Sequence, residues 1–270
     1  MGENNNFWVK AENGKDIAPD LPEKRFKKTA NTYDVNANKY DEASRRELRE
    51  QTLKPSLAGH LGDLSGKRVL DIGCGAGNSS RLAIECGAQE VVGIDISEEE
   101  IAMAQKADAG KPIEYLVRNA TGDLGDLGKF DLVMAILSVH YCADKATLEK
   151  YFSNVKKTLK PEGEFLAVVI SATDYDGYGV KITSPSGKEG EALKISVSDF
   201  QGNKFLDFED IYWSKETYEE LLEKTGFSVE WLPCAVSQEG IQKYGADFWK
   251  QFAEKPIYTI FRAKIKEENI

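Results

Sequence analysis

An apolar run that leads directly into three closely spaced glycines is the feature that most constrains how this chain can fold. Residues 69–72 have the composition of a buried strand, and Gly73, Gly75 and Gly77 follow at alternate positions. Because glycine has no Cβ atom, a ligand can approach such a loop closely, and a helix that follows it offers free amides at its N-terminus. The segment therefore predicts a strand, a ligand-binding loop and a helix.

From about Arg68 onward, short apolar runs alternate with amphipathic ones, which is the pattern of βαβ units in a parallel sheet covered on both faces. Helices are expected at 78–86, 145–159 and 214–225, and a capping box at Ser97 to Glu100 starts another. Strands are expected at 68–72, 90–94, 113–118, 130–136, 164–170, 227–232 and 257–263. The fold class is therefore α/β, with a Rossmann-like, seven-stranded, mostly parallel sheet and helices on both faces.

Two segments lie outside this pattern. The first 64 residues lack strand periodicity, and we interpret them as an N-terminal extension with a helical cap that covers the ligand-binding edge of the sheet. The α/β domain then spans residues 65–270. Within it, residues from about 171 to 213 are rich in Gly, Ser and aromatic side chains, with β-type alternation on both sides of Gln201-Gly202-Asn203. This composition predicts an inserted antiparallel hairpin that covers the substrate.

Composition disfavours several classes of partner. The formal net charge is −10 and the basic residues are scattered among acids, so we expect no nucleic acid partner. We expect no membrane span and a cytoplasmic location, because the N-terminus is polar and no apolar run approaches about 20 residues. The four cysteines are widely separated and carboxylates do not cluster, so we expect reduced thiols and no metal ion. The sequence carries no signature of oligomeric state.

The residues around the glycines indicate the kind of ligand. Dinucleotide-binding enzymes use the spacing G-x-G-x-x-G, whereas Gly75 is followed here by Gly77. A carboxylate at Asp71 would repel phosphate but suits an ammonium group. These two observations favour a cationic amino-acid tail over the pyrophosphate of a dehydrogenase cofactor. In the alternative reading, Asp71 and the later Asp95 only cap the helices that follow them.

Two later strand ends complete a nucleoside site. Asp95 follows the second expected strand, where a carboxylate can accept both hydroxyls of a ribose. Asn119 and Ala120 follow the third strand and could present a side-chain oxygen and a backbone amide to the edge of an adenine.

These elements, together with Phe130 to Ala135 and the Leu-Lys-Pro-Glu-Gly turn, resemble those of class I S-adenosylmethionine-dependent methyltransferases. The resemblance implies S-adenosylmethionine as cofactor and S-adenosylhomocysteine as product. It also implies cofactor contacts for three groups of residues. They are the methionine-side residues Asp71, Gly73, Cys74, Gly75 and Asn78, the nucleoside-side residues Asp95, Ile96, Asn119 and Ala120, and Ala135 or Ile136 near the ammonium through a carbonyl. Asn119 replaces the acid that the family usually has there, and the Cys74 thiol is expected to be inert.

Two further segments resemble small-molecule methyltransferases. Residues 33–41 are similar to an N-terminal segment that closes over the cofactor in such enzymes, which makes Tyr33 and Tyr40 candidates for the site. Residues 208–213, 236–240 and 244–249 are similar to the corresponding parts of toxoflavin synthase and its relatives. Those relatives are N-methyltransferases of azapteridine-type heterocycles, so the resemblance implies an acceptor of that kind.

His140 is the candidate general base, because it follows the fourth strand and an imidazole titrates near neutral pH. In the alternative reading it only positions the substrate. Tyr141 and Tyr40 are the other catalytic candidates, and an aromatic box that stacks a flat acceptor is expected from Tyr33, Tyr40, Tyr141, Tyr212 and Trp213. Of these, Tyr33, Tyr212 and Trp213, with His140, are the substrate-binding candidates; aromatic residues at such spacings also occur as plain core.

The sequence thus predicts an S-adenosylmethionine-dependent methyltransferase of a small molecule, and the resemblance to toxoflavin synthase-type enzymes implies N-methylation of a heterocycle. Two alternatives stay open. One is methylation of an oxygen or an amine nitrogen on another metabolite, since acceptor chemistry is set by pocket shape rather than by the fold. The other is a non-catalytic protein that binds the cofactor as a sensor or as a partner of an active subunit.

Overall fold

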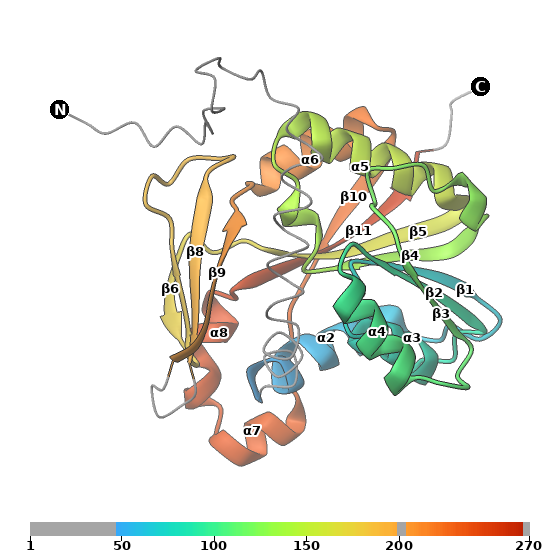
Figure 1. Ribbon diagram of the computed structural model, residues 1–270. Helices are drawn as coiled ribbons and strands as arrows, with labels where there is room; N and C mark the ends of the chain where they lie inside the picture. The colour runs from blue at the N-terminus through green and yellow to red at the C-terminus, as the bar shows by residue number, and fades with distance from the viewer. Residues whose placement is uncertain (1–46, 199–203, 267–270) are drawn as a thin grey trace, which may run out of the picture.

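A seven-stranded mixed sheet forms the centre of the protein (Figure 1). The computed structural model describes residues 47–198 and 204–266. The strand order is β10-β11-β5-β4-β1-β2-β3. Strands from β5 to β3 pair in parallel, whereas β11 is antiparallel to both β5 and β10. The strands are β1 (Arg68–Ile72), β2 (Glu90–Asp95), β3 (Ile113–Val117), β4 (Phe130–Ile136), β5 (Leu159–Ile170), β10 (Phe227–Leu232) and β11 (Tyr258–Ile265). The expected sheet is confirmed.

Helices cover both faces of this sheet (Figure 1). On one face lie α2 (Lys54–Leu61), α3 (Asn78–Glu85) and α4 (Glu98–Ala107), and on the other α5 (Lys145–Thr158) and α6 (Lys215–Lys224). Successive strand residues therefore enter two different cores. Val69 belongs to the core that includes residues of α2 and α3, and its neighbour Leu70 to the core of α5 and α6. Burial on both sides explains why the strands are almost continuously apolar.

Side-chain caps fix where several helices begin. The Ser97 hydroxyl accepts the Glu100 N–H at 3.1 Å, and the Ser214 hydroxyl accepts the Thr217 N–H at 3.1 Å. Both caps were expected, and each satisfies an amide that has no partner inside its helix. The shorter helices are η1, a π-helix (Arg49–Leu53), η2 (Gly125–Leu127), η3 (Val139–Tyr141), α7 (Gln238–Tyr244), η4 (Asp247–Trp249) and α8 (Lys250–Glu254).

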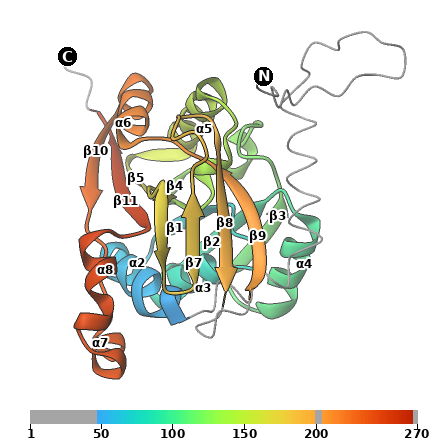
Figure 2. The same cartoon turned by 90° about the vertical axis from the view of Figure 1, so that its left-hand side faces the viewer.

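A second, antiparallel sheet lies beside the first, and Figure 2 shows it facing the viewer. Its order is β6 (Asp174–Gly177), β7 (Val180–Thr183), β8 (Ala192–Ser198) and β9 (Lys204–Ile211). The expected hairpin is thus one half of a four-stranded sheet. The other half, β6 and β7, turns through Tyr178 and Gly179, whose φ angles are 51° and 74°. Two positive φ angles make a tight hairpin turn, but a tyrosine there gives no turn signal in the sequence.

The start of β5 also differs from the expectation. Leu159 already pairs with Phe130, and the register then shifts so that Glu164 pairs with Leu132. The intervening Lys-Pro-Glu-Gly segment forms the irregularity, which lets β5 begin directly after α5. The expected N-terminal cap, including Tyr33 and Tyr40, lies for the most part outside the described residues; from residue 47 onward the chain is helical up to Leu61.

Candidate functional site

A cavity of about 330 Å³ opens at the carboxyl ends of β1, β2 and β4, where open α/β sheets bind their ligands. Three groups of residues line it. The glycine loop and the ends of β2 and β3 contribute Gly73, Cys74, Gly75, Asn78, Asp95, Ile96, Asn119 and Ala120. The end of β4 contributes Ile136, Leu137, Ser138, His140 and Tyr141. The opposite wall comes from η1 and β9, with Arg49, Leu53, Phe208 and Asp210. The cavity therefore reaches from the glycine loop to the second sheet.

Two glycines of the loop are required by packing. Gly73 has φ +72°, and a Cβ atom there would collide with the side chain of Ser138. Gly77 has φ +85°, and a Cβ atom there would collide with the hydroxyl group of Tyr115. The backbone N–H of Gly73 donates to the carbonyl of Ile94 at 2.7 Å, which ties the loop to β2. These glycines shape the loop rather than leave room for a ligand.

Gly75 also lines the cavity, but a side chain there would collide with no protein atom. Its φ is +50°, and the nearest atom to an added Cβ would be Oε2 of Glu100 at 3.5 Å, an ordinary contact. Its N–H donates to Oδ2 of Asp95 at 2.9 Å, and the other carboxylate oxygen, Oδ1, accepts the Ser97 N–H at 3.0 Å. A carboxylate oxygen can accept more than one hydrogen bond. Asp95 is therefore held at the cavity wall and suits the hydroxyls of a ribose.

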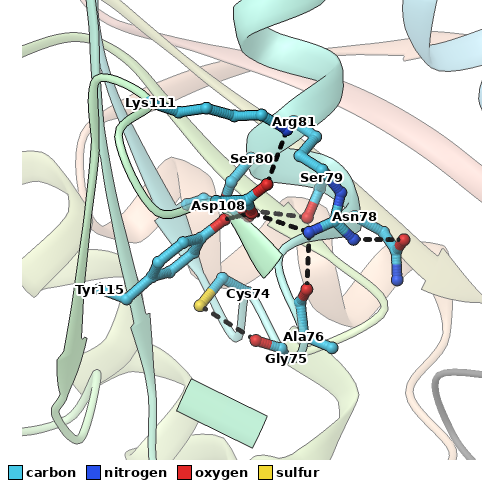
Figure 3. Close-up of polar contacts among 11 residues, drawn as sticks. Cys74, Gly75, Ala76, Asn78, Ser79, Ser80, Arg81, Asp108, Lys111 and Tyr115 are labelled. Carbon is cyan, nitrogen blue, oxygen red and sulfur yellow. Dashed lines mark hydrogen bonds and ion pairs between the residues drawn. The ribbon is translucent and has the colours of Figure 1, made fainter. Parts of the chain in front are cut away.

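An ion network around the buried carboxylate of Asp108 supports the loop (Figure 3). Oδ2 of Asp108 accepts the Tyr115 hydroxyl at 2.7 Å and Nη1 of Arg81 at 2.8 Å, and Oδ1 accepts Lys111 Nζ at 2.8 Å. Burial raises the pKa of Asp108, but these three hydrogen bonds outweigh it and hold the pKa below its usual value. Arg81 also donates to the carbonyl of Ala76 at 2.9 Å. The network thereby fixes the backbone between Gly75 and Gly77.

Asp71 does not reach the cavity. Its side chain is fully buried, and Oδ2 accepts the hydroxyls of Ser79 at 2.7 Å and Ser80 at 2.6 Å at the start of α3. Burial raises the pKa of Asp71 to about 6, and the two hydroxyls oppose that rise. The geometry matches the helix-capping alternative rather than direct contact with an ammonium group.

The turn after β3 presents donors rather than the expected acceptor. Oδ1 of Asn119 accepts both the backbone N–H and the hydroxyl of Thr121, each at 2.9 Å. The carbonyl of Ala120 accepts Nδ2 of Asn154, also at 2.9 Å. The donors that remain here among the described residues, the Asn119 amide nitrogen and the Ala120 N–H, suit the ring nitrogens of an adenine. The oxygen expected to meet the adenine amino group is used inside the protein.

The end of β4 turns sharply toward the cavity at Leu137. This leucine has φ +57°, a left-handed conformation that costs a bulky residue about 1–2 kcal/mol. The Ser138 hydroxyl donates to the carbonyl of Ile72 at 2.7 Å and joins the turn to β1. Ile136 therefore lines the cavity, whereas Ala135 stays buried within the sheet and does not. Leu137 and Ser138 were not expected as site residues, because nothing in their identity marks a strained backbone.

His140 is paired with a residue that the sequence did not single out. Its Nε2 lies 3.3 Å from Oδ2 of Asp210 on β9, and both side chains are almost completely buried. Burial, together with the charge of Arg49, lowers the pKa of His140 to about 3. Burial raises the pKa of Asp210 to about 7 against the opposing effects of the Tyr141 hydroxyl and Arg49. His140 is therefore neutral beside a carboxyl group that ionises near neutral pH.

The expected aromatic box is brought together only in part. Tyr141 lines the cavity, and its ring lies 4.7 Å from that of His140. Phe208, which no motif indicated as a separate candidate, also lines it, because Phe208 and Asp210 are two residues apart on one face of β9. Tyr212 and Trp213 follow the end of that strand and do not line the cavity. Trp213 is core, and its Nε1 donates to the carbonyl of Cys142 at 3.1 Å.

The sheet order, the glycine loop and the cavity at the strand ends define a Rossmann-like methyltransferase fold. The family model of the methyltransferase domain matches residues 69–163. YqeM of Bacillus subtilis is 33% identical over 192 residues, which cover 67% of this chain and 76% of that protein. Demethylmenaquinone methyltransferase of Lactococcus lactis is 31% identical over 186 residues, 62% of this chain and 68% of that protein. The chain belongs to the class I S-adenosylmethionine-dependent methyltransferases.

The solved structures agree on the fold. The complex of DhpI with SAH aligns with a TM-score of 0.62 at 16% sequence identity, and the alignment covers 92% of this chain and 100% of that one. S-adenosylmethionine is the cofactor, and the residues of the cavity fit it: Gly75 leaves backbone open to a ligand, and Asp95 offers a fixed carboxylate. Among the described residues, no helix is both long and apolar enough to span a membrane.

Proposed function

We propose that this protein methylates a ring nitrogen of a small heterocyclic molecule. The observation that carries the proposal is the extent of the cavity, which joins the wall at Gly75 and Asp95 to a second region around His140, Tyr141 and Asp210. A protein that only bound the cofactor would need the first region alone. The second region offers a place for an acceptor next to the methyl group.

When bound, the cofactor would supply an electrophilic methyl group, which the acceptor would take while the electron pair of the carbon–sulfur bond stayed on sulfur. The residues of the protein have simpler tasks. Gly75 and Asp95 hold the cofactor, Tyr141 and Phe208 enclose a flat acceptor, and the wall from η1 and β9 excludes water. Holding the reacting atoms in line accounts for a large share of the rate enhancement in such displacements.

The preference for a heterocycle rests on two features. The resemblance of residues 208–213 and 236–249 to toxoflavin synthase-type enzymes points to azapteridine-like acceptors. In addition, the acceptor region combines the aromatic Tyr141 and Phe208 with the polar pair His140 and Asp210. Planar rings with polar edges suit such a lining.

Mass spectrometry tests the proposal. The protein is incubated with methyl-deuterated S-adenosylmethionine and a panel of azapteridines, pyrimidines, amines, phenols and carboxylates. Label in a ring nitrogen of a heterocycle supports the proposal. Label only in a phenol, carboxylate or amine keeps the methyltransferase and discards the heterocycle. If the protein binds S-adenosylhomocysteine tightly but labels no acceptor, the non-catalytic alternative gains weight.

A further inference from the structure

His140 and Asp210 form a buried polar pair that has no regular hydrogen bonds. Within the part of the chain that the structure describes, the ring nitrogens of His140 and the carboxylate oxygens of Asp210 have no partner with regular hydrogen-bond geometry, although the Tyr141 hydroxyl lies close enough to lower the pKa of Asp210. Buried polar atoms are nearly always paired in folded proteins, since an unpaired one costs stability. An exception of four atoms in one place, on the wall of a cavity, indicates that a ligand completes the site.

The pair joins the two sheets. His140 belongs to η3, which follows the main-sheet strand β4, and Asp210 belongs to β9 of the second sheet. The charged and titratable groups that act on the pair come from three further positions. Arg49 on η1 lowers the pKa of both residues, Tyr141 lowers that of Asp210, and the Tyr218 hydroxyl on α6 is influenced by the charge of Asp210. Only a folded second sheet brings the carboxyl group to the imidazole.

We propose that His140 and Asp210 act as one proton acceptor for a weakly acidic N–H or O–H of the acceptor. Asp210, a positioning residue, holds the proton of His140 on Nε2, the nitrogen that faces it at 3.3 Å. The other nitrogen, Nδ1, is then the acceptor. The proton leaves the acceptor and moves to Nδ1, while the electron pair of the broken N–H or O–H bond remains on the nitrogen or oxygen that is methylated. The Asp210 carboxylate balances the charge of the imidazolium.

This inference rests on the proposed function and narrows its substrate class. A pyridine-type ring nitrogen attacks through a lone pair that it already has, so a base contributes little before the bond forms. An aliphatic amine is protonated near neutral pH and would enter the site as a cation. A lactam, an imide or a phenol must lose its proton, and a base at the site removes that barrier. The positive charge of Arg49 acts on both His140 and Asp210 and disfavours a cationic amine beside them. The site therefore suits a neutral ring with an acidic N–H or O–H.

The pH dependence follows from the state that the pair must have. Proton acceptance needs Asp210 ionised and His140 neutral. Because burial raises the pKa of Asp210 to about 7 and keeps His140 neutral, this state forms as the pH rises through about 7. The transition belongs to the pair as a unit, so its apparent pKa is a property of both residues.

Nitrogen NMR of the full-length protein labelled with ¹⁵N-histidine tests the pair without an acceptor. The chain has only two histidines, and His60→Gln leaves His140 as the single signal. Above pH 8 we expect one tautomer with its proton on Nε2, and a change in the ¹⁵N shifts as the pH falls through about 7. Asp210→Asn should abolish that change. Asp207→Asn, which removes an exposed carboxylate from the same strand, should preserve it.

Two results would overturn the proposal that His140 and Asp210 act as one proton acceptor. One is a mixture of tautomers in the wild-type protein above pH 8, which is decisive even where Asp210→Asn does not fold. The other is a spectrum of His140 that Asp210→Asn leaves unchanged. Calorimetric titration of the same samples with S-adenosylhomocysteine separates this inference from the proposed function. If the wild-type protein does not bind S-adenosylhomocysteine, the methyltransferase function fails; if it binds and either of the two results is found, only the pair fails.

Discussion

Replacing Gly75 by alanine should weaken cofactor binding with only a modest loss of stability. Gly75 lines the cavity with φ +50°, and a Cβ atom there meets no atom closer than 3.5 Å. The added methyl group therefore fits the protein but occupies space next to the ligand. Its cost to the fold is the left-handed conformation, about 1–2 kcal/mol.

The substitution should remove a larger fraction of the free energy of cofactor binding than of the free energy of folding. A methyl group forced into a well-packed contact typically costs about 1–3 kcal/mol. That range corresponds to a loss of S-adenosylhomocysteine affinity between about fivefold and about 150-fold. Calorimetric titration measures the affinity, and thermal unfolding measures the stability.

Gly110→Ala is the matched control. Gly110 also has a positive φ, +86°, has no atom within 4 Å of an added Cβ and does not line the cavity. Both variants should lose a similar amount of unfolding free energy, but only Gly75→Ala should lose affinity. If Gly75→Ala binds S-adenosylhomocysteine as tightly as Gly110→Ala does, the loop does not contact the cofactor in the way described here.

Three further variants test other parts of the structure. Asp210→Asn should make the free energy of unfolding less sensitive to pH. In the wild-type protein the native pKa of Asp210, about 7, lies above the usual 3.8, so the native state holds more protons than the unfolded state between these pH values. Wild-type unfolding free energy therefore falls as pH rises through that window, by as much as about 4 kcal/mol, and chemical denaturation at pH 4 and 8 should show a smaller fall in the variant. Gly73→Ala should give much less soluble, folded protein and a lower melting temperature by circular dichroism, because its Cβ atom would collide with Ser138. A melting temperature equal to that of the wild type contradicts this. Asp108→Asn leaves Arg81 without its buried carboxylate and should lower the free energy of unfolding by about 3–5 kcal/mol. It should also weaken the binding of S-adenosylhomocysteine, and an unchanged affinity would show that the network does not hold the loop in its binding conformation.

The main sheet was predictable from the sequence because its signals are local. The bounds of β1 and β4 match the expected ones, and the caps at Ser97 and Ser214 were visible as single residues before amphipathic runs. A strand buried on both faces leaves an apolar run that ends where a turn begins, so both its existence and its ends can be read.

The second sheet and the acceptor end of the cavity were less predictable, because their determinants are not local. The β6–β7 hairpin turns at Tyr178 and Gly179, of which the tyrosine gives no turn signal, and its strands are too short to show alternation. Asp210 lies next to His140 only because β9 contacts η3 in the folded protein. Asp71 looked like a ligand contact by position, but the hydroxyls of two serines in the following helix take its Oδ2.

The most direct test of the central claim is calorimetric titration of the wild-type protein with S-adenosylhomocysteine and, separately, with NADH. Asp95, held by the N–H groups of Gly75 and Ser97, suits the ribose of either ligand, but the spacing of the glycines suits an amino-acid tail. We expect saturable one-to-one binding of S-adenosylhomocysteine and no heat of binding from NADH. Binding of NADH without S-adenosylhomocysteine would contradict the assignment of this cavity to a methyltransferase.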